Sequence, residues 1–266
     1  MKLNNLSHIQ SEIRQIAKAV LRNGWGEATS GNFSWNVTSS ITQDMLAELI
    51  KGKAYPTPEA LPELGGQVLL ISASGSRMRT FAEGFSEDYC LIHISEDGHS
   101  YLCFDSEGKH PKAKPTSEIP AHFEVHRLLE ETGKPHKAVL HTHMTEAVIV
   151  THHHEYKSEK KLNAILMAML PEMTTFLPSG VGILPYDLPG SQSIGKATAQ
   201  KLRDFDVVFW EKHGCLSVGI SLHDAMDKQE IIAKSLQVFF RCLQYGYQPE
   251  GLTGKQLRDL KRAYSS

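Results

Sequence analysis

The sequence predicts an α/β fold: a single domain, residues 1–266, with a mixed, mainly antiparallel β-sheet flanked by helices. Segments with helical and strand periodicity interleave along the chain, as in proteins whose helices pack on the faces of a sheet. The predicted strands also occur in neighbouring pairs, which favours a mixed sheet over an all-parallel one. The chain contains no internal repeat, low-complexity tract or convincing domain boundary.

The helices are predicted from apolar residues spaced three or four positions apart. In the first helix Ile13, Ile16 and Val20 share one face, and Asn23-Gly24 ends it. By the same criterion we expect helices over residues 9–22, 41–51, 117–132, 145–154, 159–170, 193–204 and 222–244.

The strands are predicted from short apolar or alternating runs bounded by turn residues. QVLLISA, residues 67–73, is the strongest of them, and residues 207–219 are typical of a hairpin-like pair. Residues 52–66 are rich in proline and glycine and predict a loop. Further strands are expected over residues 32–37, 88–94 and 100–104, at 136–143, and within the Pro/Gly-punctuated segment 171–190.

Composition narrows the class of protein. Hydrophobic residues make up 41% and charged residues 22%, which is typical of a soluble globular protein that buries its core without disulfides. A net charge of -2 argues against a nucleic-acid or polybasic membrane surface. The four scattered cysteines predict reduced thiols. No signal peptide or membrane-spanning run is recognisable, so we expect a cytoplasmic location.

Two histidine motifs are candidates for a metal site. His141 and His143 end an apolar strand, where residues two apart point to the same side, and paired imidazoles are half of a typical zinc site. Two half-buried histidines that bind the backbone explain the spacing equally well. His213 precedes Gly214, which would allow a close backbone approach. The sequence alone slightly favours a turn histidine there over a third ligand.

The segment Pro115–Glu118 is expected to open a helix, with Thr116 or Ser117 as the N-cap. Glu118 is then either a carboxylate stabilised by the helix dipole, or a general base or carboxylate that shares a metal. Ser30-Gly31-Asn32, Ser74-Gly75-Ser76 and Thr116-Ser117 offer amides and hydroxyls that can hold a phosphate. Ordinary turns explain these polar segments as well.

Other histidines have simpler interpretations. His152, His153 and His154 fan around a predicted helix end, so they cannot all face one ion and are expected to be solvated. His122 and His126 lie one helical turn apart and are expected to line or support the pocket.

Taken together, the motifs resemble those of the class II aldolase/adducin-head family. The matching stretches occur in the expected order across nearly the whole chain: GW…SGN (24–32), SASG (72–75), PTSEIPAH (115–122), VLHTH (139–143), LPSGVGILPYDLPG (177–190), SIGKATAQ (193–200) and KHG (212–214). The resemblance implies a mixed α/β fold, a homotetramer and one Zn²⁺ per subunit.

By motif position, the resemblance also implies a role for each site residue. His141, His143 and His213 would ligate zinc, and Glu118 would be the catalytic acid/base. Glu172 would reach an active site across a subunit interface. The phosphate would be held by Thr29, Asn32, Ser74, Gly75, Thr116 and Ser117, with Thr29 in a position where a second asparagine is expected.

The implied reaction is reversible retro-aldol cleavage of L-rhamnulose 1-phosphate to dihydroxyacetone phosphate and L-lactaldehyde. Another sugar-phosphate aldolase, an epimerase or a dehydratase of the same family is the alternative, because all could use similar metal chemistry. A non-enzymatic adducin-type binding module is a third possibility. It should lack the metal ligands, so the three histidines and Glu118 argue against it.

Overall fold

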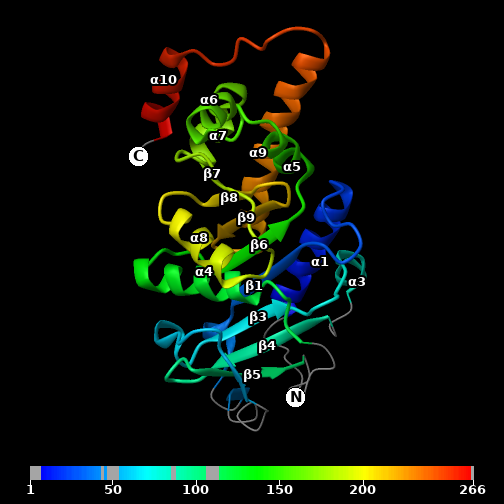
Figure 1. Ribbon diagram of the computed structural model, residues 1–266, viewed down its shortest axis with the longest axis vertical. Coiled ribbons are helices and arrows are strands. Elements are labelled where there is room, and N and C mark those ends of the chain that lie inside the picture. Colours follow the sequence, from blue (N-terminus) through cyan, green and yellow to red (C-terminus); the bar gives the residue numbers. More distant parts are fainter. Residues whose placement is uncertain (1–6, 43–44, 47–53, 85–87, 106–113, 265–266) are drawn as a thin grey trace.

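The computed structural model describes residues 7–42, 45–46, 54–84, 88–105 and 114–264. The described strands form one nine-stranded sheet in the order β2-β5-β4-β3-β1-β6-β9-β8-β7 (Figure 1). The strand bounds are β1 Asn32–Asn36, β2 Ala54–Pro56, β3 Val68–Ser72, β4 Tyr89–Ile94, β5 Ser100–Phe104, β6 Ala138–Thr142, β7 Gly182–Leu184, β8 Val207–Trp210 and β9 Gly214–Gly219.

The pairing confirms a mixed, mainly antiparallel sheet. Every described pair of neighbouring strands is antiparallel except β7 and β8, which are parallel. The register of the central strands matters for function, because Asn32 at the start of β1 lies opposite His141 on β6. Thr142, the next residue of β6, lies opposite Cys215 on β9. Three chain segments therefore meet at one end of the central strands.

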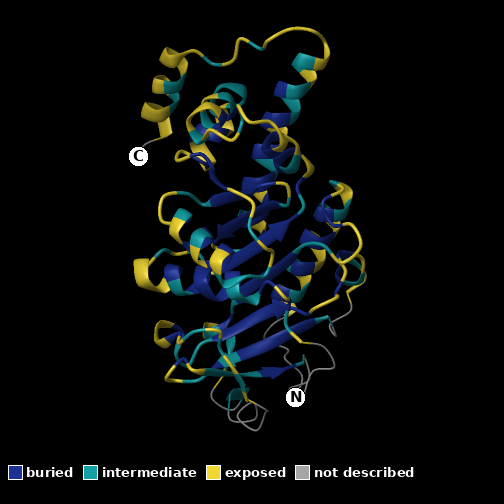
Figure 2. Cartoon of the chain, in the orientation of Figure 1, coloured by how far each residue is buried: buried dark blue, intermediate teal, exposed yellow. Residues whose placement is uncertain are grey.

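The helices cover both faces of the sheet. Their bounds are α1 Ser7–Arg22, α3 Met78–Glu83, α4 Ile119–Thr132, α5 Thr145–His152, α6 Glu159–Met169, α7 Pro171–Phe176, α8 Gln192–Lys201, α9 Leu222–Gln244 and α10 Gly254–Tyr264. Apolar residues of α1, α5, α6 and α9 pack with Leu70 and Leu140 on one face. Residues of α4 and α8 pack with Val139 and Leu216 on the other. The buried sheet therefore lies between two helical layers (Figure 2).

Most predicted elements are confirmed within two or three residues, but several elements are not predicted by the sequence patterns. Strand β2 and the 3₁₀ turn Pro62–Leu64 lie in the segment predicted as a loop. Helix α7 occupies the beginning of the segment predicted as a strand, with Pro171 in its first turn. Helices α3 and α10 also have no sequence prediction. The helix expected at 41–51 falls largely outside the described residues.

Two further predictions from composition can be compared with the structure. None of the four cysteines forms a disulfide in the described structure, and Cys90, Cys103 and Cys215 are buried. Among the described helices, none combines the length and the apolar character needed to cross a membrane.

Candidate active site

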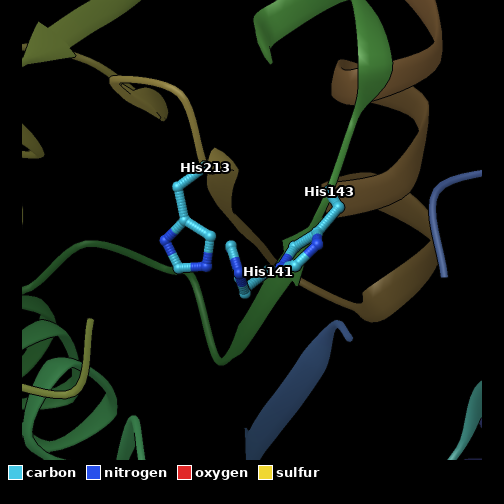
Figure 3. Close-up of side chains that lie close together, drawn as sticks. All are labelled: His141, His143 and His213. Carbon is cyan, nitrogen blue, oxygen red and sulfur yellow. The ribbon is translucent and has the colours of Figure 1, made fainter. Parts of the chain in front are cut away.

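Three histidines from two separate segments come together at the end of the central strands (Figure 3). His141 is on β6, His143 directly follows the end of β6, and His213 lies in the turn between β8 and β9. Gly214 permits this arrangement, because a Cβ atom there would lie 2.2 Å from the carbonyl oxygen of Thr142. The turn therefore packs directly on the end of β6, and His213 is more than a simple turn residue.

The ring nitrogens of these histidines are arranged as metal ligands would be. One nitrogen of each ring lies within 4.8 Å of those of the other two. Nδ1 of His141 donates to the carbonyl of Cys215 at 2.9 Å, whereas its Nε2 is buried without a hydrogen-bond partner in the described structure. Burial lowers the pKa of His141 to about 3 and that of His213 to about 4. Both rings are therefore neutral, the form that binds a divalent metal.

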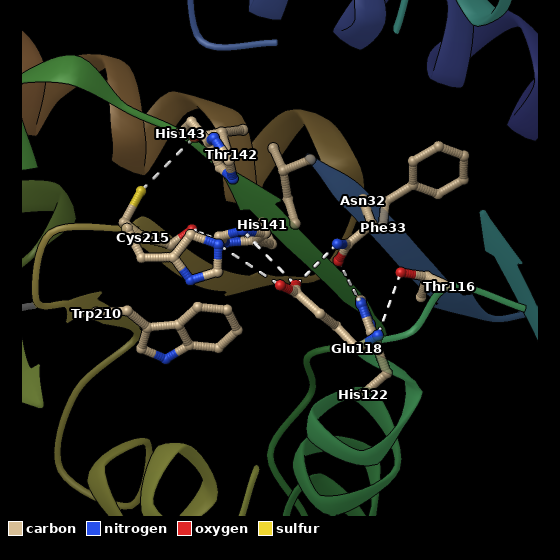
Figure 4. Close-up of polar contacts among 12 residues, drawn as sticks. Asn32, Phe33, Thr116, Glu118, His122, His141, Thr142, His143, Trp210 and Cys215 are labelled. Atoms are coloured by element: carbon tan, nitrogen blue, oxygen red, sulfur yellow. Dashed lines mark hydrogen bonds and ion pairs between the residues drawn. The ribbon is translucent and has the colours of Figure 1, made fainter. Parts of the chain in front are cut away.

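The carboxylate of Glu118 faces the same point. Its Oε2 lies 3.6 Å from Nε2 of His141, and its Oε1 lies 3.6 Å from Nε2 of His213. Asn32 fixes it by donating from Nδ2 to Oε2 at 2.8 Å (Figure 4). Glu118 is only 6% exposed, so this carboxylate is held in a defined orientation and directed toward the histidines.

A buried hydrogen-bonded chain supports Asn32 from behind. His122 Nε2 lies 2.7 Å from Asn32 Oδ1, and its Nδ1 lies 2.7 Å from the hydroxyl of Ser34. The same hydroxyl lies 2.8 Å from Nε2 of His126. Burial lowers the pKa of both histidines, so they are neutral hydrogen-bonding residues. They support the site, as expected from the sequence, and do not join the three-histidine cluster.

An open cavity of about 520 Å³ adjoins the histidines. It brings together every residue that the sequence indicated for phosphate binding. Its lining consists of Glu27, Ala28, Thr29, Ser30, Gly31, Asn32, Ala73, Ser74, Gly75, Ser76, Thr116, Ser117, Glu118, His141 and His143. His213 borders it through its contact with His141, with ring centroids 4.8 Å apart.

Two details differ from the sequence-based expectation. Helix α4 begins at Ile119 with Glu118 as its N-cap, so neither Thr116 nor Ser117 caps the helix. Instead the Thr116 hydroxyl accepts a hydrogen bond from the Glu118 amide at 3.3 Å. Glu172 is exposed on α7 and is absent from the lining of this chain's described cavity.

Two further residues at the site have no sequence pattern that indicates them. Glu27 Oε1 lies 2.6 Å from Nδ1 of His143. Burial alone would raise the pKa of Glu27, but its hydrogen bond with His143 and smaller interactions lower it overall. Trp210 packs its indole against His141 and His213, with centroid distances of 4.6 and 5.3 Å. Only the position of Glu27 within the GW…SGN motif could have drawn attention to it.

The fold agrees with comparisons to known proteins. Residues 11–240 match the class II aldolase and adducin N-terminal domain family, and the chain belongs to this family. It is an enzyme of the aldolase class, a carbon–carbon lyase.

Particular relatives span almost the whole chain. A rhamnulose-1-phosphate aldolase of Bacteroides thetaiotaomicron is 30% identical over 99% of this chain and 97% of its own length. A rhamnulose-1-phosphate aldolase of Listeria welshimeri is 28% identical over 91% of this chain and 84% of its own length. The crystal structure of a sugar-phosphate aldolase from Thermotoga maritima superimposes with a TM-score of 0.76 at 30% identity, covering 92% of this chain and 100% of that one.

Proposed function

We propose that this protein is a zinc-dependent aldolase that reversibly cleaves L-rhamnulose 1-phosphate into dihydroxyacetone phosphate and L-lactaldehyde. The observation that carries the proposal is the convergence of the three-histidine cluster, the Glu118 carboxylate and a polar cavity at one end of the sheet. The full-length relatives named as rhamnulose-1-phosphate aldolases support this substrate over other sugar phosphates.

His141, His143 and His213 would hold the zinc ion. Three imidazole ligands with an open position are the usual arrangement of catalytic zinc. The unpartnered, buried Nε2 of His141 fits this role, because a buried polar atom otherwise needs a hydrogen-bond partner. When bound, the ion would supply Lewis-acid stabilisation of the negative charge that develops on the ketose during cleavage.

The phosphate would lie in the part of the cavity formed by small polar residues. Its lining includes the hydroxyl-bearing residues Thr29, Ser74, Thr116 and Ser117 together with Gly75, while no lysine or arginine is among the described lining residues. Hydroxyl and backbone N–H donors can bind phosphate without a full positive charge. Asn32, also in the lining, would add a side-chain amide close to Glu118. These contacts would align the substrate rather than take part in the chemistry.

Glu118 would transfer the proton at C3. In cleavage the C4 hydroxyl would lose its proton to solvent, the C3–C4 bond would break, and the electron pair of that bond would remain on the dihydroxyacetone phosphate half. Glu118, protonated from solvent, would then give its proton to C3, and in the synthetic direction the Glu118 carboxylate would remove that proton. The bond from Asn32 and the proximity of both carboxylate oxygens to the histidines support this role, because they fix where the proton is delivered.

We further propose that the enzyme is a cytoplasmic homotetramer in which Glu172 completes the site of a neighbouring subunit. Glu172 is exposed on α7, and the cavity of its own chain is formed without it.

The substrate proposal is tested by incubating the zinc-loaded protein with L-rhamnulose 1-phosphate and measuring both products. We expect dihydroxyacetone phosphate and L-lactaldehyde to form in equal amounts. L-fuculose 1-phosphate is the matched control, and it should be cleaved more slowly. A protein with bound zinc that interconverts ketose phosphates without releasing either product would instead be an epimerase, and loss of water would indicate a dehydratase.

A further inference from the structure

The turn formed by residues 27–31, which leads into β1, is one wall of the cavity. Glu27 and Thr29 both line the cavity. The turn is tight, because the Ser30 amide donates to the Glu27 carbonyl at 2.9 Å and Ala28 has a φ of +49°. Such a left-handed conformation is uncommon for a residue other than glycine. This turn therefore holds a neighbour of the metal cluster and a candidate phosphate residue two positions apart.

His143 determines where this turn is held. Its Nδ1 lies 2.6 Å from Glu27 Oε1, and its backbone amide donates to the carbonyl of Trp25 at 3.1 Å. Within the described chain, no other side-chain hydrogen bond joins residues 27–30 to the rest of the protein. Residues 27–29 are exposed, so packing contributes little to their position. The Glu27–His143 bond is therefore the main side-chain anchor of the turn.

We propose that Glu27 is a positioning residue that couples metal binding at His143 to phosphate binding at this turn. The inference rests on the proposed function. A metal bound through Nε2 requires the proton of a neutral imidazole to sit on Nδ1, the atom that faces Glu27. Without the metal, the His143 ring can change tautomer or rotate. The bound form thus holds the Glu27 carboxylate, and with it Thr29, in the position that a phosphate needs.

Thermodynamic linkage makes this coupling measurable from either side. If zinc raises phosphate affinity by some factor, phosphate must raise zinc affinity by the same factor. Direct attraction between the ion and the phosphate also contributes, so the total factor is not diagnostic. The part that depends on Glu27 is diagnostic, and it is found by comparing variants.

The test is calorimetric titration of inorganic phosphate into metal-free protein and into protein loaded with one zinc per chain. In the wild type we expect the zinc form to bind phosphate at least about fivefold more tightly, a typical lower limit for coupled sites. Glu27→Ala should reduce this ratio severalfold. The ratio for Glu27→Gln should lie between those of the wild type and Glu27→Ala, because an amide oxygen still accepts a hydrogen bond from Nδ1 of His143 but carries no charge.

Ser74→Ala is the matched control, since it removes a candidate phosphate contact outside the turn. It should weaken phosphate binding in both forms and leave their ratio unchanged. If Glu27→Ala loses zinc, competition with a chelator measures the same coupling in reverse, with phosphate present and absent. If the ratio of phosphate affinities with and without zinc is the same in the wild type and in Glu27→Ala, the role of Glu27 is overturned but the proposed function is not. A wild-type protein that binds no phosphate in either form overturns the proposed function and the inference together.

Discussion

At the scale of single residues, the structure distinguishes interpretations that the sequence left open. His141 and His143 were compatible with backbone hydrogen bonding, and one nitrogen of His141 does bind a carbonyl. The buried Nε2 of His141 has no hydrogen-bond partner in the described structure, and His213 lies beside it although it comes from a distant turn. Both observations favour a metal site. The sequence spacing of the histidines could not show that His213 joins the other two, because the approach of the two segments depends on the pairing of β6 with β9.

Glu118→Gln provides the residue-scale prediction. The amide keeps the size of the side chain but cannot carry the proton, so we expect cleavage of L-rhamnulose 1-phosphate to fall by about 10²–10⁴-fold. Zinc content, measured by elemental analysis, should stay at the wild-type level, and the phosphate affinity should change little. Wild-type turnover in this variant would exclude Glu118 as the acid/base.

At the scale of elements, β8 and α8 form a support for the histidine cluster. The buried indole of Trp210, the last residue of β8, packs against two of the histidines. Its Nε1 donates to Thr198 Oγ1 on α8 at 2.9 Å, and that hydroxyl donates to the Ile194 carbonyl at 2.6 Å. The sequence predicts both elements correctly. It cannot indicate that Trp210 supports the histidine cluster, because a tryptophan in an apolar strand is typical of any hydrophobic core.

Thr198→Val should therefore destabilise the protein although it preserves the shape of the side chain. It leaves a buried indole N–H without an acceptor, which costs about 1–3 kcal/mol. Thr198→Ser keeps the hydroxyl and is the control. Urea unfolding should show a lower free energy of unfolding for Thr198→Val than for Thr198→Ser. Equal stabilities would mean that the Trp210–Thr198 bond contributes nothing.

At the scale of the whole molecule, the sequence predicted the fold class and most of the long elements. Helix α9, for example, begins and ends at the predicted residues, 222 and 244, because its apolar residues repeat regularly over many turns. Strand β2 has only three residues and contains Pro56, so it lacks any period, and its formation depends on pairing with β5. The six-residue helices α3 and α7 depend on tertiary packing in the same way.

The proposed assembly makes a whole-molecule prediction that uses Glu172. Glu118→Gln and Glu172→Ala should each be nearly inactive when purified alone. After the two are unfolded and refolded together, about a quarter of wild-type activity should return, because half the chains retain Glu118 and half of their neighbours retain Glu172. Sedimentation should show a tetramer throughout. No recovery in mixed tetramers would place Glu172 outside the neighbouring site.

The proposed function requires that the three histidines hold the metal on which cleavage depends. The direct measurement is a zinc titration of metal-free protein, with formation of dihydroxyacetone phosphate from L-rhamnulose 1-phosphate as the readout. Activity should rise from near zero and reach its plateau at one zinc per chain. His141→Ala should bind zinc weakly and stay inactive at that ratio, whereas His152→Ala, at the exposed end of α5, should match the wild type. Full activity without metal, or wild-type zinc binding in His141→Ala, would contradict the account.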